Sequence, residues 1–419
     1  MIGLADCNNF YASCEQHFQP RLRNRPVVVL SNNDGNIIAR SAAAKAMGVS
    51  MAEPYFKVKD ELEQMGCEVF SSNYALYQDM SDRVHTTLQM VTPEVESYSI
   101  DEAFVGVPGH TTPTMYANTA RRKVWEWTGV PISIGMASTK TRAKLANHIA
   151  KRADWTLGVL DMEAFFDPDR LLDNIAVGEV WGIGPKRAKL LADNRIFSAK
   201  DLRDADTRWI KQRLTVMGLR TVLELRGQVC YPLSKAPGAQ QRIMASGSFG
   251  QRVYERSGVE GAIAHHAARA ARKLRGQGLQ ATQVFAFLTT GHYGRGPHYG
   301  NGHTLKLPLP TAYTPTITQY ALQGLRRIWR RGYGYKKAGV MVQGLKPRGG
   351  VQADAFVATD SEQEGKLMEA IDAINGKYGR GTVHLGRVQP KRKQVWAMNQ
   401  ARRSPRYTTR MGEVLTVRA

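Results

Sequence analysis

In the first 165 residues, short β-branched runs alternate with helical patterns, and this alternation predicts an α/β or α+β core. The first strand must lie centrally to meet a later strand pair, so we expect one sheet with helices on one face. The expected strands are Ile2–Asp6, Pro26–Ser31, Glu68–Phe70, Val95–Tyr98, Ala103–Val107, Ile132–Met136 and Gly158–Leu160. The expected helices include Phe10–His17, Ser41–Met47 and Tyr74–Met90.

The pattern changes three times along the rest of the chain. Short helices punctuated by glycine predict a small helical domain up to about residue 233, and the Pro, Gly and polar content of 234–241 is typical of a linker. Beyond it, helical patterns over Gly261–Arg275 and Thr316–Arg331 mix with strand-like runs and predict an independent basic α+β module. The final part is either a docked arm or a tether, because residues 377–419 carry eleven Lys and Arg and one acid, Glu413.

The formal net charge is +22, which favours a polyanionic partner without separating nucleic acid from an acidic membrane. Residues 1–110 hold 8 Lys and Arg against 14 Asp and Glu, whereas the remainder holds 50 against 22. This distribution suggests a metal-binding catalytic core surrounded by DNA-binding regions. The alternative is a basic surface that is only solvated. No apolar run approaches the roughly 20 residues of a membrane span, so we expect a cytoplasmic protein. The four cysteines lack zinc-site spacing and are expected to be buried free thiols.

Three carboxylates carry the predicted chemistry. Asp101 and Glu102 are adjacent between two alternating apolar runs, and Asp6 ends the first strand. Like charges held close together cost free energy unless cations neutralise them, and hard oxygen ligands suit magnesium better than zinc. The alternative is an ordinary acidic turn at the surface, which is the usual place for such a pair.

Several motifs, in one order along the chain, resemble those of the Y-family of translesion DNA polymerases. They are D-C-N-N-F-Y-A-S-C-E (6–15), V-V-V-L-S-N-N-D-G (27–35), S-S-N-Y (71–74), D-M-S (79–81), Y-S-I-D-E-A-F (98–104), K-T-x-A-K-L-A-N-H (140–148), V-W-G-I-G (180–184), Y-x-K-A-G-V-M (335–341) and S-P-R-Y-T-T-R (404–410). The resemblance covers nearly the whole chain.

This resemblance implies a multidomain α+β fold shaped as a right-hand polymerase. It has a ferredoxin-like palm, small fingers, a helical thumb with a helix-hairpin-helix element, an α+β little finger and a basic C-terminal tail. The implied boundaries are 1–25 and 71–166 for the palm, 26–70 for the fingers, 167–233 for the thumb, 234–241 for the linker, 242–347 for the little finger and 348–419 for the C-terminal extension.

The resemblance also assigns the catalytic and metal-binding residues. Asp6, Asp101 and Glu102 would bind two magnesium ions, and the backbone carbonyl of Cys7 would complete one coordination shell. Two such ions lower the pKa of a primer hydroxyl and stabilise both the entering and the leaving oxygen of a phosphoryl transfer.

For the incoming nucleotide, Tyr11 matches the steric gate that lies under the sugar, and Phe10 precedes it; both could instead be simple core residues. Lys45 and Lys151 match phosphate-binding positions, with solvated surface lysines as the alternative. Many relatives have arginine at the first of these positions and tyrosine three residues earlier. Here Lys45 follows Ala42, so Ser41 or Arg40 is expected to share the triphosphate.

Small side chains are expected above the templating base. Ile38 and Ala39 match the positions that cover it, and their size leaves room for poorly fitting pairs, because discrimination by shape needs a tight pocket.

For the DNA, Gly182, Gly184 and Lys186 read independently as the hairpin of a helix-hairpin-helix element, which binds a phosphate without reading bases. The alternative is an ordinary interhelical turn. In the basic module, the candidate phosphate contacts are Arg242, Arg252, Lys306 and Lys336.

The predicted function is error-prone translesion synthesis in the SOS response, by nucleotidyl transfer from dNTPs to a primer. The resemblance implies UmuD′-like accessory subunits and RecA as partners, and Gln352–Phe356 loosely resembles a sliding-clamp peptide. A non-catalytic DNA-binding scaffold that recruits repair proteins is the alternative, but it has no need for three carboxylates. A palm-fold nucleotide cyclase would leave the hairpin element and the basic module unexplained.

Overall fold

The computed structural model describes residues 1–109, 111–234, 240–291, 296–348, 362–379, 381–386 and 396–414. The chain divides into two compact units. Unit 1 comprises Met1–Ser31, Gly35–Pro237 and Arg402–Ala419, and unit 2 comprises Asn32–Asp34 and Gly238–Ala401. No helix in the described ranges combines the length and the apolar character that crossing a membrane requires.

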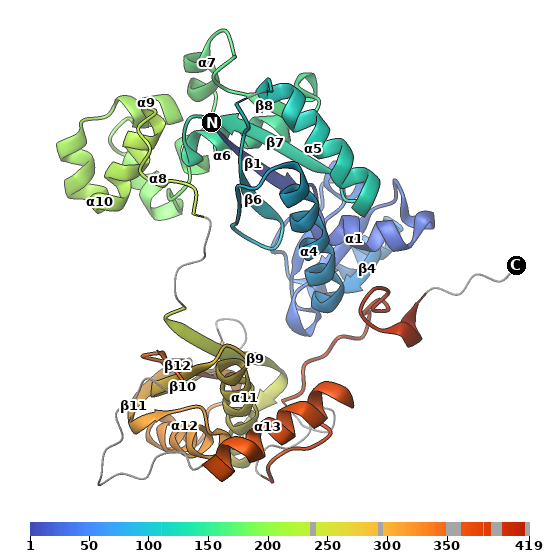
Figure 1. Cartoon of the computed structure of the whole chain (residues 1–419), viewed down its shortest axis with the longest axis vertical. Helices are drawn as coiled ribbons and strands as arrows, with labels where there is room; N and C mark the ends of the chain where they lie inside the picture. Colours follow the sequence, from blue (N-terminus) through green and yellow to red (C-terminus); the bar gives the residue numbers. More distant parts are fainter. Residues whose placement is uncertain are drawn as a thin grey trace, which may run out of the picture. The chain divides into compact units, whose positions relative to one another are not determined.

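A five-stranded sheet forms the centre of unit 1 (Figure 1). Its strand order is β5 (Val95–Ser97), β6 (Glu102–Gly106), β1 (Ile2–Cys7), β7 (Ile132–Ala137) and β8 (Val159–Asp161). β1 pairs antiparallel with both β6 and β7, and β7 pairs parallel with β8. The predicted central position of the first strand is therefore confirmed.

Helices cover both faces of this sheet, so the expectation of helices on one face was wrong. Ala5 and Val105 pack in one core cluster with α4 (Tyr74–Val91) and α5 (Pro113–Thr128). Leu4 and Phe104 pack in another with α6 (Lys140–Ala150). The reason lies in the alternation of strand side chains, because β1 places apolar residues on both of its faces.

A close approach fixes α6 against the sheet. A Cβ at Gly135 of β7 would lie 1.9 Å from the backbone nitrogen of Asn147, so no larger residue fits there. The buried Asn147 side chain donates from Nδ2 to the carbonyls of Leu4 and Ser133, at 3.1 and 2.9 Å. Helix and sheet are thus joined by backbone contact and hydrogen bonds beneath the strand that carries Asp6.

A second, three-stranded sheet in unit 1 has the order β3-β2-β4. It consists of β2 (Val27–Leu30), β3 (Ile37–Arg40) and β4 (Glu68–Ser71), with α1 (Phe10–Phe18), α2 (Ala42–Ala46) and α3 (Tyr55–Gln64) nearby in the chain. β3 and α3 were not predicted. β3 has only four residues, too few for a clear alternation, and it forms by pairing with the wholly buried β2.

The helical stretch predicted after residue 167 is confirmed. It contains α7 (Pro168–Asp173), α8 (Pro185–Ala192), α9 (Ala199–Asp204) and α10 (Thr207–Leu225). The start of α9 has a complete capping box between Ser198 and Asp201.

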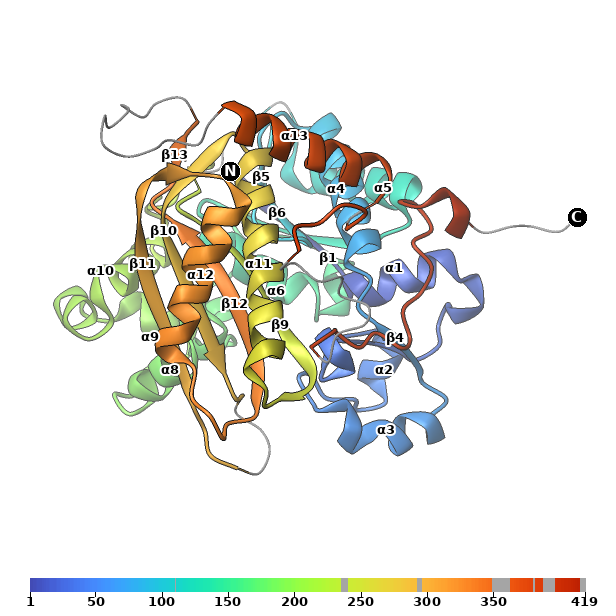
Figure 2. The ribbon, with the colours of Figure 1, turned by 90° about the horizontal axis from the view of Figure 1, so that it is seen from below.

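Unit 2 contains a five-stranded antiparallel sheet, in which four strands have the order β11-β10-β12-β9 and the fifth lies off this path. The strands are β9 (Arg242–Val253), β10 (Leu279–Thr289), β11 (Gly300–Thr311) and β12 (Tyr335–Gln343), and β13 (Lys346–Pro347) pairs with β10. In Figure 2, α11 (Arg256–Gly276) and α12 (Thr314–Ile328) run across one face of this sheet, where their apolar residues share its core.

β9 and α13 (Glu362–Lys377) were also missed. β9 contains small and polar residues, R-I-M-A-S-G-S-F-G-Q-R-V, which carry little intrinsic strand preference. Its pairing with β12 supplies what the local sequence lacks. The predicted linker falls mostly, and the Gln352–Phe356 peptide wholly, outside the described residues.

Candidate active site

The backbone of the central sheet brings the predicted carboxylates together. Asp6 lies opposite Glu102 in the antiparallel pairing of β1 with β6. One residue further on, the backbone N–H of Cys7 donates to the carbonyl of Asp101 at 2.8 Å. Residues 95 positions apart in the chain thus meet at one end of β1.

The turn before β6 is held by Ser99. Its hydroxyl donates to Oδ1 of Asp101 at 2.6 Å and accepts the backbone N–H groups of Asp101 and Glu102, at 3.2 and 3.0 Å. These bonds fix both the carboxylate and the backbone of the pair.

Two lysines of the α6 region pair with the carboxylates. Lys151 Nζ pairs with Oδ1 of Asp6, and Lys144 Nζ lies 2.9 Å from Oε1 of Glu102. Lys144 also lies 4.4 Å from the centroid of the Tyr98 ring, a distance that allows a cation–π contact. Lys144 was not predicted, although it stands two helical turns before Lys151 and therefore on much the same face.

Burial dominates the electrostatics of Asp6. Desolvation raises its pKa to about 6, although Lys151 acts in the opposite direction, and the charges of Glu102 and Asp101 raise it further. Among the described residues, no three His, Cys, Asp or Glu side chains are grouped closely enough to hold a metal ion. The shared metal site of Asp6, Asp101 and Glu102 therefore stays a prediction, although hard oxygen donors in a poorly hydrated position suit a divalent cation.

A cavity of about 620 Å³ opens beside these groups. It contains five basic side chains and three acidic ones, and this excess of positive charge suits a polyphosphate. The basic residues are Arg40, Lys45, Lys144, Lys151 and Arg152, and the acidic ones are Asp6, Glu102 and Glu179. Burial and the neighbouring cations Arg40, Lys151 and Arg152 lower the pKa of Lys45.

The residues expected at the templating base lie on β3, where Ala39 is buried and Ile38 is half-buried. The Ser41 hydroxyl is already used in hydrogen bonds to the backbone. It is 1% exposed, and its hydroxyl caps α2 at the N–H of Ala44 while bonding the backbone of Arg25 and Val27. A phosphate contact from Ser41 would cost these bonds, whereas Arg40 and Lys45 already line the cavity.

Tyr11 lies within a cluster of aromatic rings. Its ring stacks on that of Tyr77, with centroids 4.4 Å apart and an interplanar angle of 16°, and meets Tyr74 edge-on at 6.2 Å. Burial raises the pKa of the Tyr11 phenol to about 12. Phe10 is 4% exposed and belongs to the core, so its ring supports Tyr11 from 5.7 Å.

In the helical part of unit 1, the two glycines of the predicted helix-hairpin-helix element have backbone conformations compatible with a hairpin before α8. Gly182 has φ +88°, a conformation that favours glycine, and Gly184 is the N-cap of α8. Both glycines and Lys186 are exposed.

In unit 2, two of the four predicted DNA contacts lie in one row across the sheet. Arg242 faces Gln343, Gln343 faces Gln283, and Gln283 faces Lys306. We call this row the basic row; its neighbours along the strands are buried Ile243 and Val342, so its side chains lie on the face away from the helices. Arg252 and Lys336 instead donate to the carbonyls of Gly334 and Gly250.

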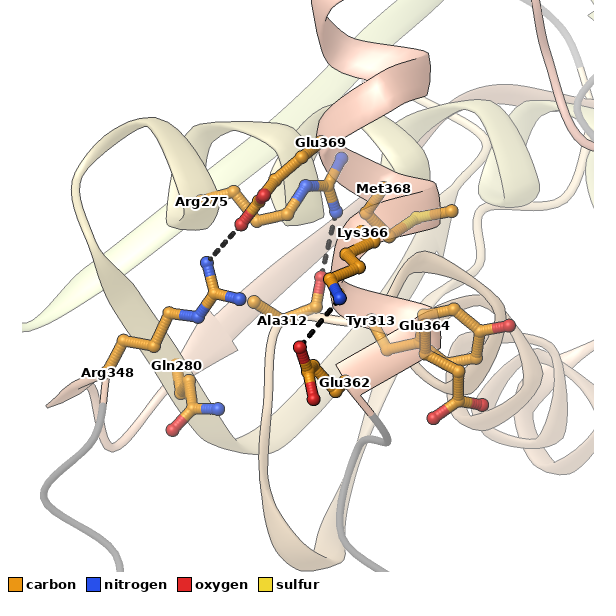
Figure 3. Close-up of a pocket in the computed structure, with 11 residues that line it drawn as sticks. Arg275, Gln280, Ala312, Tyr313, Arg348, Glu362, Glu364, Lys366, Met368 and Glu369 are labelled. Carbon is orange, nitrogen blue, oxygen red and sulfur yellow. Dashed lines mark hydrogen bonds and ion pairs between the residues drawn. The ribbon is translucent and has the colours of Figure 1, made fainter.

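A further cavity of about 270 Å³ lies between α13 and the body of unit 2 (Figure 3). Its charged groups pair with one another: Arg348 with Glu369 at 2.9 Å, and Lys366 with Glu362 at 2.7 Å. The Lys366–Glu362 pair lies within α13, whereas Arg348–Glu369 and Arg275–Asp372, at 2.7 Å, join α13 to the rest of unit 2. These pairs explain the charged lining without a ligand.

The fold matches a solved structure, a Y-family DNA polymerase chimera, with a TM-score of 0.66 over 83% of this chain and 100% of that chain. At 16% identity this likeness shows the fold alone, and it confirms the predicted fold class.

Residues 5–148 match the impB/mucB/samB family, and residues 240–355 match the C-terminal domain of that family. Protein UmuC of Salmonella typhimurium is 43% identical over the full length of both chains. DNA polymerase IV of Caulobacter vibrioides is 27% identical over 92% of this chain and 93% of its own. The chain belongs to the impB/mucB/samB family, and the predicted resemblance is confirmed. Membership implies use of a divalent metal ion. Residues 365–417 match a domain of unknown function.

Proposed function

We propose that this chain is a DNA-directed DNA polymerase that performs error-prone translesion synthesis in the SOS response. One observation carries the proposal: the strand end that holds Asp6 and Glu102 borders a cavity with an excess of basic side chains. A polyphosphate would suit that charge, and the carboxylates would supply the oxygen ligands that metal-assisted phosphoryl transfer uses.

Asp6, Asp101, Glu102 and the Cys7 carbonyl would hold two magnesium ions, and Lys144 and Lys151 would give up their pairings there. When bound, the ions would stabilise the charge that develops on the entering and leaving oxygens. The chain itself contributes the orientation. Ser99 fixes the Asp101 carboxylate, while Lys45, Lys151 and Arg152 lie where they would neutralise the triphosphate tail.

The remaining assignments follow the same arrangement. The stacked Tyr11 ring would exclude a 2′-hydroxyl, and Ile38 and Ala39 would leave room above a damaged template base. Gly182, Gly184 and Lys186 would bind a DNA phosphate. Arg242 and Lys306 would bind further phosphates from the basic row. UmuD′-like subunits and RecA are the proposed partners, with a sliding clamp as a further one.

Primer extension tests the proposal. Purified chain with primer–template, magnesium and dNTPs is expected to extend the primer, and Asp101→Asn is expected to remove extension. Asp82→Asn, the same change at an exposed position of α4, serves as the control. Equal activity of Asp101→Asn and wild type rejects the site, and DNA binding without any extension by the wild type favours the scaffold.

A further inference from the structure

The C-terminal segment Arg402–Arg410, which we call the strap, docks on unit 1. Its start continues the edge of β4, since Ser71 and Arg402 exchange two hydrogen bonds, at 3.0 Å from the Ser71 N–H and 2.9 Å to the Ser71 hydroxyl. Further along, the Tyr407 ring stacks on that of Phe18 with centroids 4.9 Å apart. Of the two expectations for the C-terminal part, a docked arm or a tether, this segment therefore forms a docked arm.

Asn73 holds the middle of the strap. Its side-chain nitrogen lies 3.1 Å from the Ser404 carbonyl, 2.9 Å from the Ser404 hydroxyl and 3.1 Å from the Pro405 carbonyl. Asn73 is 1% exposed and Ser404 is 4% exposed. Hydrogen bonds at such positions are hard to replace by water, so the strap is part of the interior here.

The Ser404 hydroxyl continues inward to a buried carboxyl group. Oε1 of Glu15 accepts from the Ser404 hydroxyl at 2.9 Å and from the Tyr77 phenol at 2.7 Å. Glu15 is fully buried, so no solvent takes the place of either donor. The strap and Tyr77 therefore share one acceptor.

Tyr77 in turn supports Tyr11, because the two rings are stacked at 4.4 Å. An unbroken series of contacts thus leads from the strap to the Tyr11 ring, which would lie under the sugar. No part of the proposed catalytic machinery requires Ser404, Asn73 or Glu15, and the strap lies within the segment that matches a domain of unknown function.

We propose that the strap is a specificity element, in which Ser404 and Asn73 position Tyr11 through Glu15 and Tyr77 and thereby strengthen discrimination against ribonucleotides. The inference rests on the proposed function. Ser404 and Asn73 are positioning residues, since neither touches the nucleotide.

The test compares kcat/KM for dNTP and rNTP insertion by the full-length chain. Ser404→Ala removes the hydroxyl, and Tyr77→Phe removes the other donor while keeping the ring. Each is expected to raise the ratio of rNTP to dNTP insertion about fivefold, the equivalent of one net hydrogen bond, with dNTP insertion within about twofold of wild type. Ser404→Thr keeps a hydroxyl and is expected to restore discrimination.

Two controls frame the result. Tyr11→Ala, expected to admit ribonucleotides, gives the largest relaxation. Met411→Ala changes a side chain that is 89% exposed in the same tail and is expected to leave the ratio unchanged. Because Ser404 and Tyr77 act through one carboxyl group, the double variant is expected to relax discrimination by less than the product of the single effects.

Wild-type discrimination in both Ser404→Ala and Tyr77→Phe, alongside a relaxed Tyr11→Ala, would overturn the inference and leave the polymerase intact. If Ser404→Ala does not fold, Tyr77→Phe and Asn73→Asp decide in the same way. A wild-type chain that inserts no dNTP at all rejects the proposed function, and the inference with it.

Discussion

The cavity of unit 1 and the basic row of unit 2 use charge in opposite ways. Around Asp6, carboxylates and lysines are partly buried and paired, so the neighbouring charges act on the pKa of Asp6, and the ion pairs fix the positions of the side chains. On the unit 2 sheet, Arg242 and Lys306 are exposed and stand at the two ends of the row, three strands apart. Burial strengthens the interactions between neighbouring charges, which suits a catalytic site. Exposed charges are screened by salt and contribute independently to affinity, which suits DNA binding that does not depend on base sequence.

The largest expected difference between the two regions is in catalysis. Asp6→Asn is expected to lower the rate of primer extension by roughly 10³-fold or more, because it removes a negative charge from the proposed metal site. DNA affinity, measured by fluorescence anisotropy, is expected to stay within about twofold of wild type. A variant that loses DNA binding and activity together would mean that the two regions do not divide these tasks.

Next in size is a pH-dependent effect on stability in the interior of unit 1. Burial raises the pKa of Glu15 to about 7 from its usual 4.5, and the hydrogen bonds from Tyr77 and Ser404 oppose that rise only in part. The folded state thus disfavours the ionised form. The stability contributed by this group is present below pH 4.5 and is lost as the pH rises through about 7.

Glu15→Gln removes the charge and keeps an oxygen for both donors. It is therefore expected to raise the free energy of unfolding by on the order of 3 kcal/mol at pH 8 and by much less at pH 5, as measured by urea denaturation. An equal gain at both pH values would show that folding does not raise the pKa of Glu15.

The smallest effects are expected on the unit 2 sheet. Arg242→Ala and Lys306→Ala should each weaken DNA binding a few-fold and reduce the slope of log affinity against log salt by about 0.9, because each removes one phosphate contact. Their combined effect should be the product of the two. Lys366→Ala, an equal loss of charge on α13 of the same unit, is the matched control. A control that weakens binding as much would indicate that net charge, and not the row, governs affinity.

Much of this protein's organisation could be predicted from its sequence. The starts of β1 and α4, the helical stretch after residue 167 and the meeting of Asp6 with Asp101 and Glu102 in the backbone could all be predicted, because each depends on local periodicity or on one strand pairing. β9 could not, since its weak strand preference is overridden by pairing with β12, which lies more than 80 residues away. Nor could the helices on both sheet faces, because the single sequence does not say what each face of β1 will bury.

The sequence by itself determined the family, the acidic strand ends and the distribution of basic charge. Only the tertiary structure decided that Lys144 pairs with Glu102, that Ser41 is occupied by the start of α2, and that Ser404 reaches Glu15, 389 positions earlier in the chain. The physical reason is the sequence separation over which the interactions act. Residue type and spacing specify local conformation, whereas the partner of a buried polar group depends on which distant segments the packing brings within hydrogen-bond distance.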